Sequence, residues 1–98
     1  MSNPYPVSPR AELDLAEQWL YIARDDLAAA DRLIDSFHET FRRLAQFPLM
    51  GEARPAFGKQ VRVAPHRNRI IFYQPEGEGV FILRVIHGAR DFRSLDQE

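Results

Sequence analysis

The sequence contains no cysteine, so it can form neither a disulfide bond nor a thiolate metal site. A chain without cysteine suits a reducing compartment, and we expect a cytoplasmic protein. The first residues show no basic segment followed by an apolar stretch, which predicts that there is no signal peptide. The longest apolar run extends only from Trp19 to Ala23, which is too short to cross a bilayer. We therefore expect no membrane partner.

Several motifs of known chemistry are also missing. The sequence has no glycine-rich phosphate loop, no nucleophile elbow and no paired-carboxylate motif. The three histidines, His38, His66 and His87, lack the spacing of metal ligands. We therefore predict neither a metal site nor a bound cofactor, and no pattern indicates a small-molecule substrate.

Lysine is nearly absent as well, because Lys59 is the only lysine and every other basic residue is arginine. The net charge is −1, yet residues 54–93 contain eight basic and three acidic residues and so carry a local charge of +5. Arginine forms bidentate contacts with carboxylates and phosphates. This concentration predicts a basic surface for a macromolecular partner. The alternative is that each arginine belongs to an ordinary solvated surface.

The composition is otherwise that of a globular protein. The chain has 98 residues, of which 45% are hydrophobic and 28% are charged. A chain of this length forms one domain around one modest core. We therefore expect a single domain over residues 1–98.

Two amphipathic helices are predicted in the first half of the chain. Ser8 and Pro9 form a helix start signal, and apolar residues at helical spacing continue over residues 9–24. The pair Asp25-Asp26 can cap a second helix that should end near residue 47, where a proline follows. The connection is so short that the two helices must form an antiparallel hairpin.

The second half of the chain changes from a helical to an extended pattern after a Pro- and Gly-rich loop over residues 47–60. Strands are predicted over residues 61–63, 69–74 and 80–87, joined by a turn at 64–68 and a tight loop at 75–79. The segment Tyr5–Ser8 is expected to add an edge strand. This order indicates an α+β fold, with an antiparallel helix hairpin packed on one face of a three- to four-stranded antiparallel sheet.

The last strand carries apolar residues on both faces, and unbroken alternation would place Val80, Ile82, Arg84 and Ile86 together on one face. Arg62 lies between two valines and should point away from them. If the helices cover one face of the sheet, we expect the guanidinium groups of Arg62 and Arg84 to project from the other face. A basic, open sheet face is the result.

Two of these residues have simpler alternatives. A buried arginine is nearly always paired, so Arg84 could instead form an ion pair with an acidic residue of a helix, such as Asp14 or Glu17. A lone histidine at the end of a strand is more often a hydrogen-bonded rim residue than a catalyst, and this applies to His87.

The chain resembles the ParE branch of the ParE/RelE toxin superfamily in six segments: "YPVSPRAELDL", "AADRLIDSF", "FPLMG", the strand with Arg62, "IIFYQ" and "ILRVIHGARD". The resemblance extends from residue 5 to about residue 95. It implies the same helix hairpin on an antiparallel sheet, and the role of toxin in a type II toxin–antitoxin module. ParE-like toxins inhibit DNA gyrase, and a cognate, ParD-like antitoxin neutralises them within a hetero-oligomeric complex.

RelE toxins of the same superfamily instead cleave mRNA on the ribosome, and this is the alternative function. Arg62 and Arg84 match positions where the superfamily places phosphate-binding arginines, and His87 could act as a general acid in a metal-independent ribonuclease. However, the lysine-rich strand of the RelE type is missing, and Gly88 rather than a tyrosine follows the histidine. A third hypothesis is an inert toxin that only binds its antitoxin.

The resemblance and the charge pattern together predict two binding surfaces. The gyrase or gyrase–DNA target is expected to contact Arg62, Arg67, Arg69, Arg84, Arg90 and Arg93. The antitoxin is expected to contact Trp19, Phe37, Phe41, Arg62, Arg84 and Arg90, with apolar residues in a groove beside the helices and acidic residues at the arginines. The alternative for the three aromatic residues is a purely structural role in the core.

Overall fold

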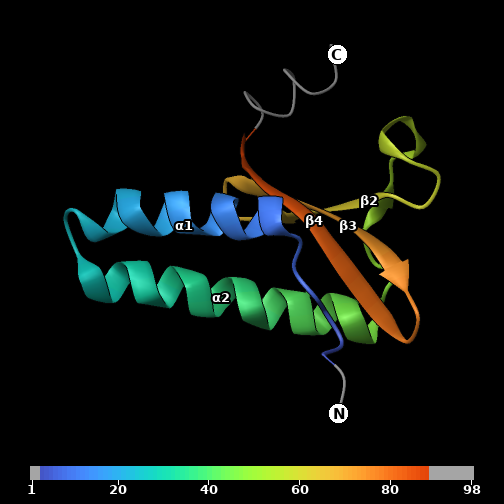
Figure 1. Ribbon diagram of the computed structural model, residues 1–98, viewed down its shortest axis with the longest axis horizontal. Helices are drawn as coiled ribbons and strands as arrows, with labels where there is room; N and C mark the ends of the chain where they lie inside the picture. The colour runs from blue at the N-terminus through green and yellow to red at the C-terminus, as the bar shows by residue number, and fades with distance from the viewer. Residues whose placement is uncertain (1–2, 89–98) are drawn as a thin grey trace.

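The computed structural model describes residues 3–88 and begins with the predicted helix hairpin (Figure 1). Helix α1 spans Pro9–Ala23 and helix α2 spans Leu27–Gln46, each within about a residue of the predicted bounds. The side chain of Ser8 caps α1 by accepting a hydrogen bond from the amide of Ala11 at 3.0 Å. Asp26 caps α2 in the same way. Both starts are therefore fixed by local side-chain chemistry.

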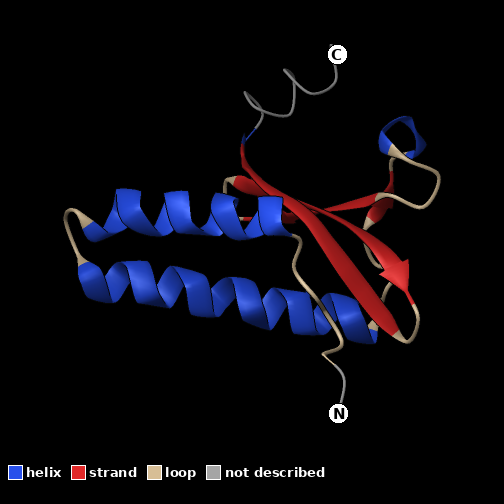
Figure 2. Cartoon of the chain, viewed as in Figure 1, coloured by secondary structure: helices blue, strands red, loops and turns tan. Residues whose placement is uncertain are grey.

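The strands form one antiparallel sheet in the order β1-β2-β3-β4, and the predicted α+β fold is confirmed (Figure 2). Their bounds are Glu52–Ala53 for β1, Arg62–His66 for β2, Arg69–Glu76 for β3 and Gly79–His87 for β4. The loop predicted over residues 47–60 contains the short strand β1 and a 3-10 turn at Pro55–Phe57. The predicted turn at 64–68 is narrower, because β2 continues to His66.

The N-terminal segment lies along the outer edge of β4, where it forms an isolated bridge and not the full edge strand that was predicted. Val7 forms a parallel bridge with Ile82, and the amide of Ile82 donates a hydrogen bond to the carbonyl of Pro6 at 2.9 Å. The amide of Val80 donates to the carbonyl of Pro4 at 3.0 Å. The chain therefore enters α1 from a position fixed on the sheet.

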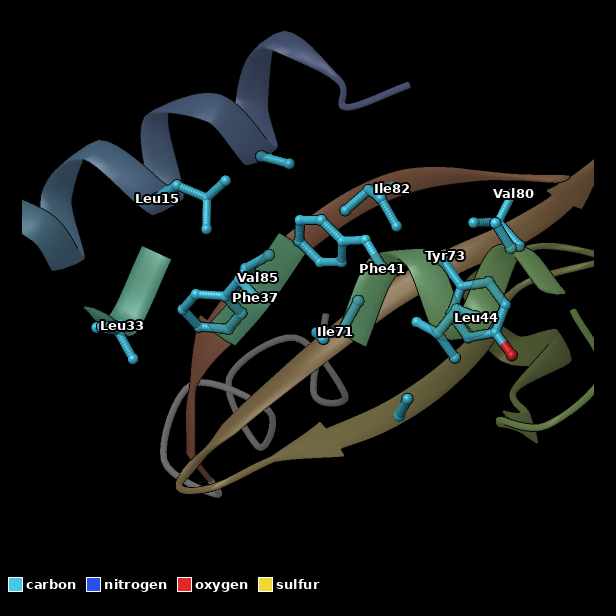
Figure 3. Close-up of a cluster of buried hydrophobic side chains, with 13 residues drawn as sticks. Leu15, Leu33, Phe37, Phe41, Leu44, Ile71, Tyr73, Val80, Ile82 and Val85 are labelled. Carbon is cyan, nitrogen blue, oxygen red and sulfur yellow. The ribbon is translucent and has the colours of Figure 1, made fainter. Parts of the chain in front are cut away.

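Hydrophobic clusters cover both faces of the sheet. On the helix side, α1 and α2 pack on β3 and β4 through a core in which Phe37, Phe41 and Tyr73 are the largest fully buried side chains (Figure 3). A second cluster on the other side contains Val61, Val63, Phe72 and Ile86, with Phe57, Ile70 and Leu83 packed against it. Neither face is left as an open polar surface, so the predicted basic sheet face is wrong.

A β-bulge in β4 explains why simple alternation fails. Tyr73 pairs with Ile82 but its neighbour Phe72 pairs with Arg84, so Leu83 is an extra residue on β4. One extra residue inverts the alternation of side chains beyond it. Ile82 consequently packs in the helix-side core while Ile86 packs in the second cluster. The prediction that these two residues share a face is wrong.

The hairpin extends beyond the sheet at the end where α1 connects to α2 (Figure 1). Of the strands, β4 lies closest to both helices. The helix surfaces that face away from the sheet contact either the other helix or solvent. Within residues 3–88, neither helix combines the length and the apolar character that a bilayer crossing requires.

Candidate functional site

Arg62 stabilises the loop after α2. Arg62 pairs directly with Tyr73 of β3, whose side chain belongs to the helix-side core. The Arg62 side chain therefore leaves the sheet on the same, helix-side face. Its Nη1 donates hydrogen bonds to the carbonyl oxygens of Gly51 at 2.6 Å and of Leu49 at 3.2 Å. Tyr73 fixes the same loop, because its hydroxyl accepts a hydrogen bond from the amide of Gly51 at 2.8 Å.

Arg84 forms the alternative ion pair with Asp14. Its Nε donates to Oδ2 of Asp14 at 2.8 Å, and its Nη2 donates to Oδ1 at 3.2 Å. The same carboxylate accepts a hydrogen bond from the amide of Val85 at 2.9 Å, and Asp14 is only 4% exposed. A buried carboxylate with these partners joins α1 to β4 at the bulge. The prediction of an internal acidic partner for Arg84 is confirmed.

The three residues of the predicted nuclease site do not converge. Arg62 lies on β2 and Arg84 lies on β4, so β3 separates them. Their guanidinium groups bind different elements, the loop after α2 and helix α1. His87 is exposed at the end of β4, where its Nε2 lies 3.4 Å from the side-chain nitrogen of Asn68.

An apolar groove lies between the two helices and holds about 490 Å³. We call it the helix groove, and its lining residues are Glu12, Leu15, Ala16, Trp19, Leu20, Ile34 and His38. The indole of Trp19 donates a hydrogen bond to Asp31 of α2 at 2.9 Å, which fixes the ring across the hairpin. Leu20 is 58% exposed, so the groove presents apolar surface to the outside.

The predicted antitoxin contacts divide between the groove and the core. Trp19 lines the helix groove, as the prediction requires. Phe37 and Phe41 are fully buried against the sheet and stack on each other, with ring centroids 6.1 Å apart. Their side chains have no exposed surface in this chain, which favours the structural role in the core over a contact with an antitoxin.

The groove residues other than Trp19 were not predicted. The sequence did contain a signal, because α1 is apolar on more of its circumference than one buried stripe requires. Leu13 and Leu20 are more than half exposed, while Leu15 is buried on the same helix. An amphipathic helix with a second apolar surface indicates a partner as well as a core.

Three arginines gather around His66, and we call Arg43, Arg67 and Arg69 the basic cluster. They come from α2, from the two-residue turn between β2 and β3, and from the first residue of β3. Arg69 is fixed by hydrogen bonds to the side chains of Gln18 and Asn68. Of the predicted target-binding residues that fall within the described part of the chain, Arg67 and Arg69 lie together here, and Arg43 was not predicted.

His66 fills the space between the turn and α2. Its Nε2 lies 2.9 Å from the Ser36 hydroxyl, and its Nδ1 lies 3.0 Å from the Thr40 hydroxyl. Ser36 donates its own proton to the carbonyl of Leu33, so its oxygen accepts from Nε2–H and Thr40 donates to Nδ1. The neutral ring is thus fully hydrogen-bonded. Burial, followed by the charges of the basic cluster, lowers the pKa of His66.

Comparison with known proteins decides which family these features belong to. The sequence model of the family described as "ParE toxin of type II toxin-antitoxin system, parDE" matches residues 5–92. This chain belongs to the ParE toxin family. A solved chain of the chromosomal ParDE TA system from P. aeruginosa has a similar fold, with a TM-score of 0.70 at 20% identity, over 86% of this chain and 94% of that one. A search of curated proteins found no match.

The ParE assignment confirms the resemblance found in the sequence. Two predicted contact residues of this ParE-family chain, Arg90 and Arg93, lie outside the described residues. Within residues 3–88, no three His, Cys, Asp or Glu side chains are grouped so that they could hold a metal ion. The candidate binding surfaces of this ParE-family chain are the helix groove and the basic cluster.

The lowered pKa of His66 predicts a pH-dependent stability. In the folded chain the pKa lies below its usual value of 6.5, so the unfolded chain binds more protons as the pH falls through that value. The contribution of His66 to stability should be complete above about pH 6.5 and should decrease at lower pH until the folded-state pKa is passed. Urea unfolding of wild type and of His66→Gln, at several pH values around and below 6.5, measures this contribution. Equal pH dependence in both proteins would contradict the prediction.

Proposed function

We propose that this chain is a toxin that inhibits DNA gyrase in the cytoplasm, and that a cognate, ParD-like antitoxin neutralises it in a hetero-oligomeric complex. Membership of the ParE family supports the toxin role, because the family is described as the toxin of a type II system. The helix groove is the single observation that supports neutralisation by an antitoxin. It is an apolar, open channel between two helices, which is the surface that an amphipathic partner helix requires.

The geometry of the groove suits a helix in particular. Trp19 is held across the hairpin by Asp31, so a partner meets a fixed aromatic wall. Rigid, preformed apolar surface lowers the entropic cost of binding. His38 closes the groove near the N-terminal segment, where its Nδ1 lies 3.3 Å from the Tyr5 hydroxyl. A partner helix would bury Leu20, which is the most exposed of the large apolar side chains in the lining.

Inhibition of gyrase by binding is favoured over cleavage of RNA. Cleavage without a metal requires an acid, a base and cations that all reach one phosphate. The guanidinium groups of Arg62 and Arg84 instead bind separate elements of the fold, and His87 lies at a third position. This arrangement supports a toxin that acts through a binding surface and not through these three residues as a nuclease.

Purified toxin is expected to block supercoiling by gyrase and to leave mRNA intact in a translating extract. The same assays with toxin premixed with its antitoxin provide the control, in which supercoiling should be restored. Cleaved mRNA together with unaffected gyrase would contradict the proposal and establish the ribosome-dependent nuclease.

Expression of the toxin alone tests the remaining hypothesis, which is an inert protein that only binds its antitoxin. A gyrase inhibitor should arrest growth and induce the response to DNA damage, whereas a ribosome-dependent nuclease should arrest translation first. Unimpaired growth at a verified level of folded toxin would identify an inert protein that only binds its antitoxin.

A further inference from the structure

We propose that the basic cluster, Arg43, Arg67 and Arg69, binds the phosphate backbone of duplex DNA. This proposal extends the proposed function and depends on it, because the DNA would be the duplex that gyrase presents where the toxin acts. The cluster would then hold the DNA segment next to the enzyme. Contacts of this kind position a protein on DNA without reading its sequence.

Charge is the first argument. Arg67 and Arg69 lie in and directly after the turn that follows His66, and Arg43 lies three residues after Thr40, whose hydroxyl is 3.0 Å from the His66 ring. The charges of all three lower the pKa of His66. Within residues 3–88, none of the three forms an ion pair with a carboxylate. Glu39 lies one turn before Arg43 on α2 but is not paired with it. The cluster is therefore a local concentration of positive charge on a chain whose net charge is −1.

The backbone of Arg67 is the second argument, and it is independent of the first. Arg67 is the one non-glycine residue with a positive φ in the described part of the chain, at 58°. Glycine and asparagine adopt this conformation with much less steric cost than a long side chain. Arginine at the tip of the turn therefore makes the fold less stable than glycine or asparagine would at this position. Costs of this kind are found where the side chain has another role.

The fold also holds the turn in place. His66 joins the turn to α2 through Ser36 and Thr40, and it does so as a neutral ring that needs no counter-ion. Arg69 is held by Gln18 and Asn68. Arg67 is exposed on a turn that is docked against the helix of Arg43. The fold thus fixes the backbone positions from which the three guanidinium groups extend, and a guanidinium group matches the bidentate geometry of phosphate oxygens.

Binding to a labelled DNA duplex at several salt concentrations tests the proposal directly. The variant Arg43→Ser with Arg67→Asn removes two charges and supplies a residue that suits the turn. The matched control is Arg24→Ser with Arg32→Ser, which removes two exposed charges elsewhere on the hairpin. Thermal unfolding of all three proteins checks folding, and the Arg67→Asn change is expected to maintain or raise Tm.

Wild-type toxin should bind with a slope of log K against log salt of about −2 to −3, which corresponds to two or three phosphates. The cluster variant should bind more than about tenfold more weakly at about 50 mM salt, whereas the control should bind like wild type. No binding by wild type, or equal binding by both variants, would overturn the proposal.

Gyrase inhibition by the same proteins separates this proposal from the proposed function. If the cluster variant loses inhibition but binds DNA like the control, the partner of the cluster is an acidic protein surface and the DNA assignment is wrong. If wild type binds DNA through the cluster but does not inhibit gyrase, the DNA assignment stands and the proposed function fails.

Discussion

Replacing Asp14 with alanine is expected to lower the free energy of unfolding by about 3–5 kcal/mol, because Arg84 loses both hydrogen bonds of its ion pair with this buried carboxylate. The amide of Val85 also loses its acceptor at the bulge. Both effects act at the junction of α1 and β4, so the helix and the strand lose their polar connection together. Urea unfolding monitored by the fluorescence of Trp19 measures the change.

Arg10→Ala is the matched control for this prediction. Arg10 also faces Asp14, but its Nε lies 3.9 Å from the carboxylate and its side chain is 55% exposed. An exposed pair at this distance contributes at most about 1 kcal/mol. A loss of stability in Asp14→Ala that is no larger than in Arg10→Ala would show that the buried pair does not join the two elements.

The second large effect is expected in the helix groove. Leu20→Glu should weaken binding of the antitoxin by at least about 100-fold, because a helix in the groove would bury an unpaired carboxylate. Stability should change little, since Leu20 is 58% exposed in the toxin alone. Calorimetric titration with the antitoxin measures affinity, and growth on co-expression measures neutralisation. Cells with this variant should stop growing even when antitoxin is present.

Leu27→Glu is the control for this variant. Leu27 is 63% exposed at the start of α2 and does not line the groove, so the same chemical change is made at similar exposure away from the proposed site. It should leave neutralisation intact. Equal loss of antitoxin binding in both variants, or normal binding by Leu20→Glu, would show that the groove is not the antitoxin site.

Local signals predicted the helices correctly. Ser8 and Asp26 cap helices through their own side chains, and helical periodicity depends only on near neighbours in the sequence. Strand β1 was not predicted, because two residues carry no periodicity. The end of β2 was placed too early because Pro65 is unusual within a strand.

The faces of the sheet could not be predicted in the same way. The bulge at Leu83 is set by pairing with β3, and no local pattern in β4 reveals it. The positions of Arg62 and Arg84 depend on this register and on acceptors far away in the sequence. Of the basic cluster, Arg67 and Arg69 were predicted from charge, but Arg43 joins them from another element.

The segment beside β4 has a consequence for how the toxin behaves in concentrated solution. The carbonyls of Pro4 and Pro6 pair with β4, and neither proline has an amide to offer on any side. The amide of Tyr5 is occupied by the side chain of Asn3 at 2.9 Å. Few donors therefore remain along this border to template another strand. This border of the sheet is therefore a poor template for edge-to-edge pairing between copies of the chain.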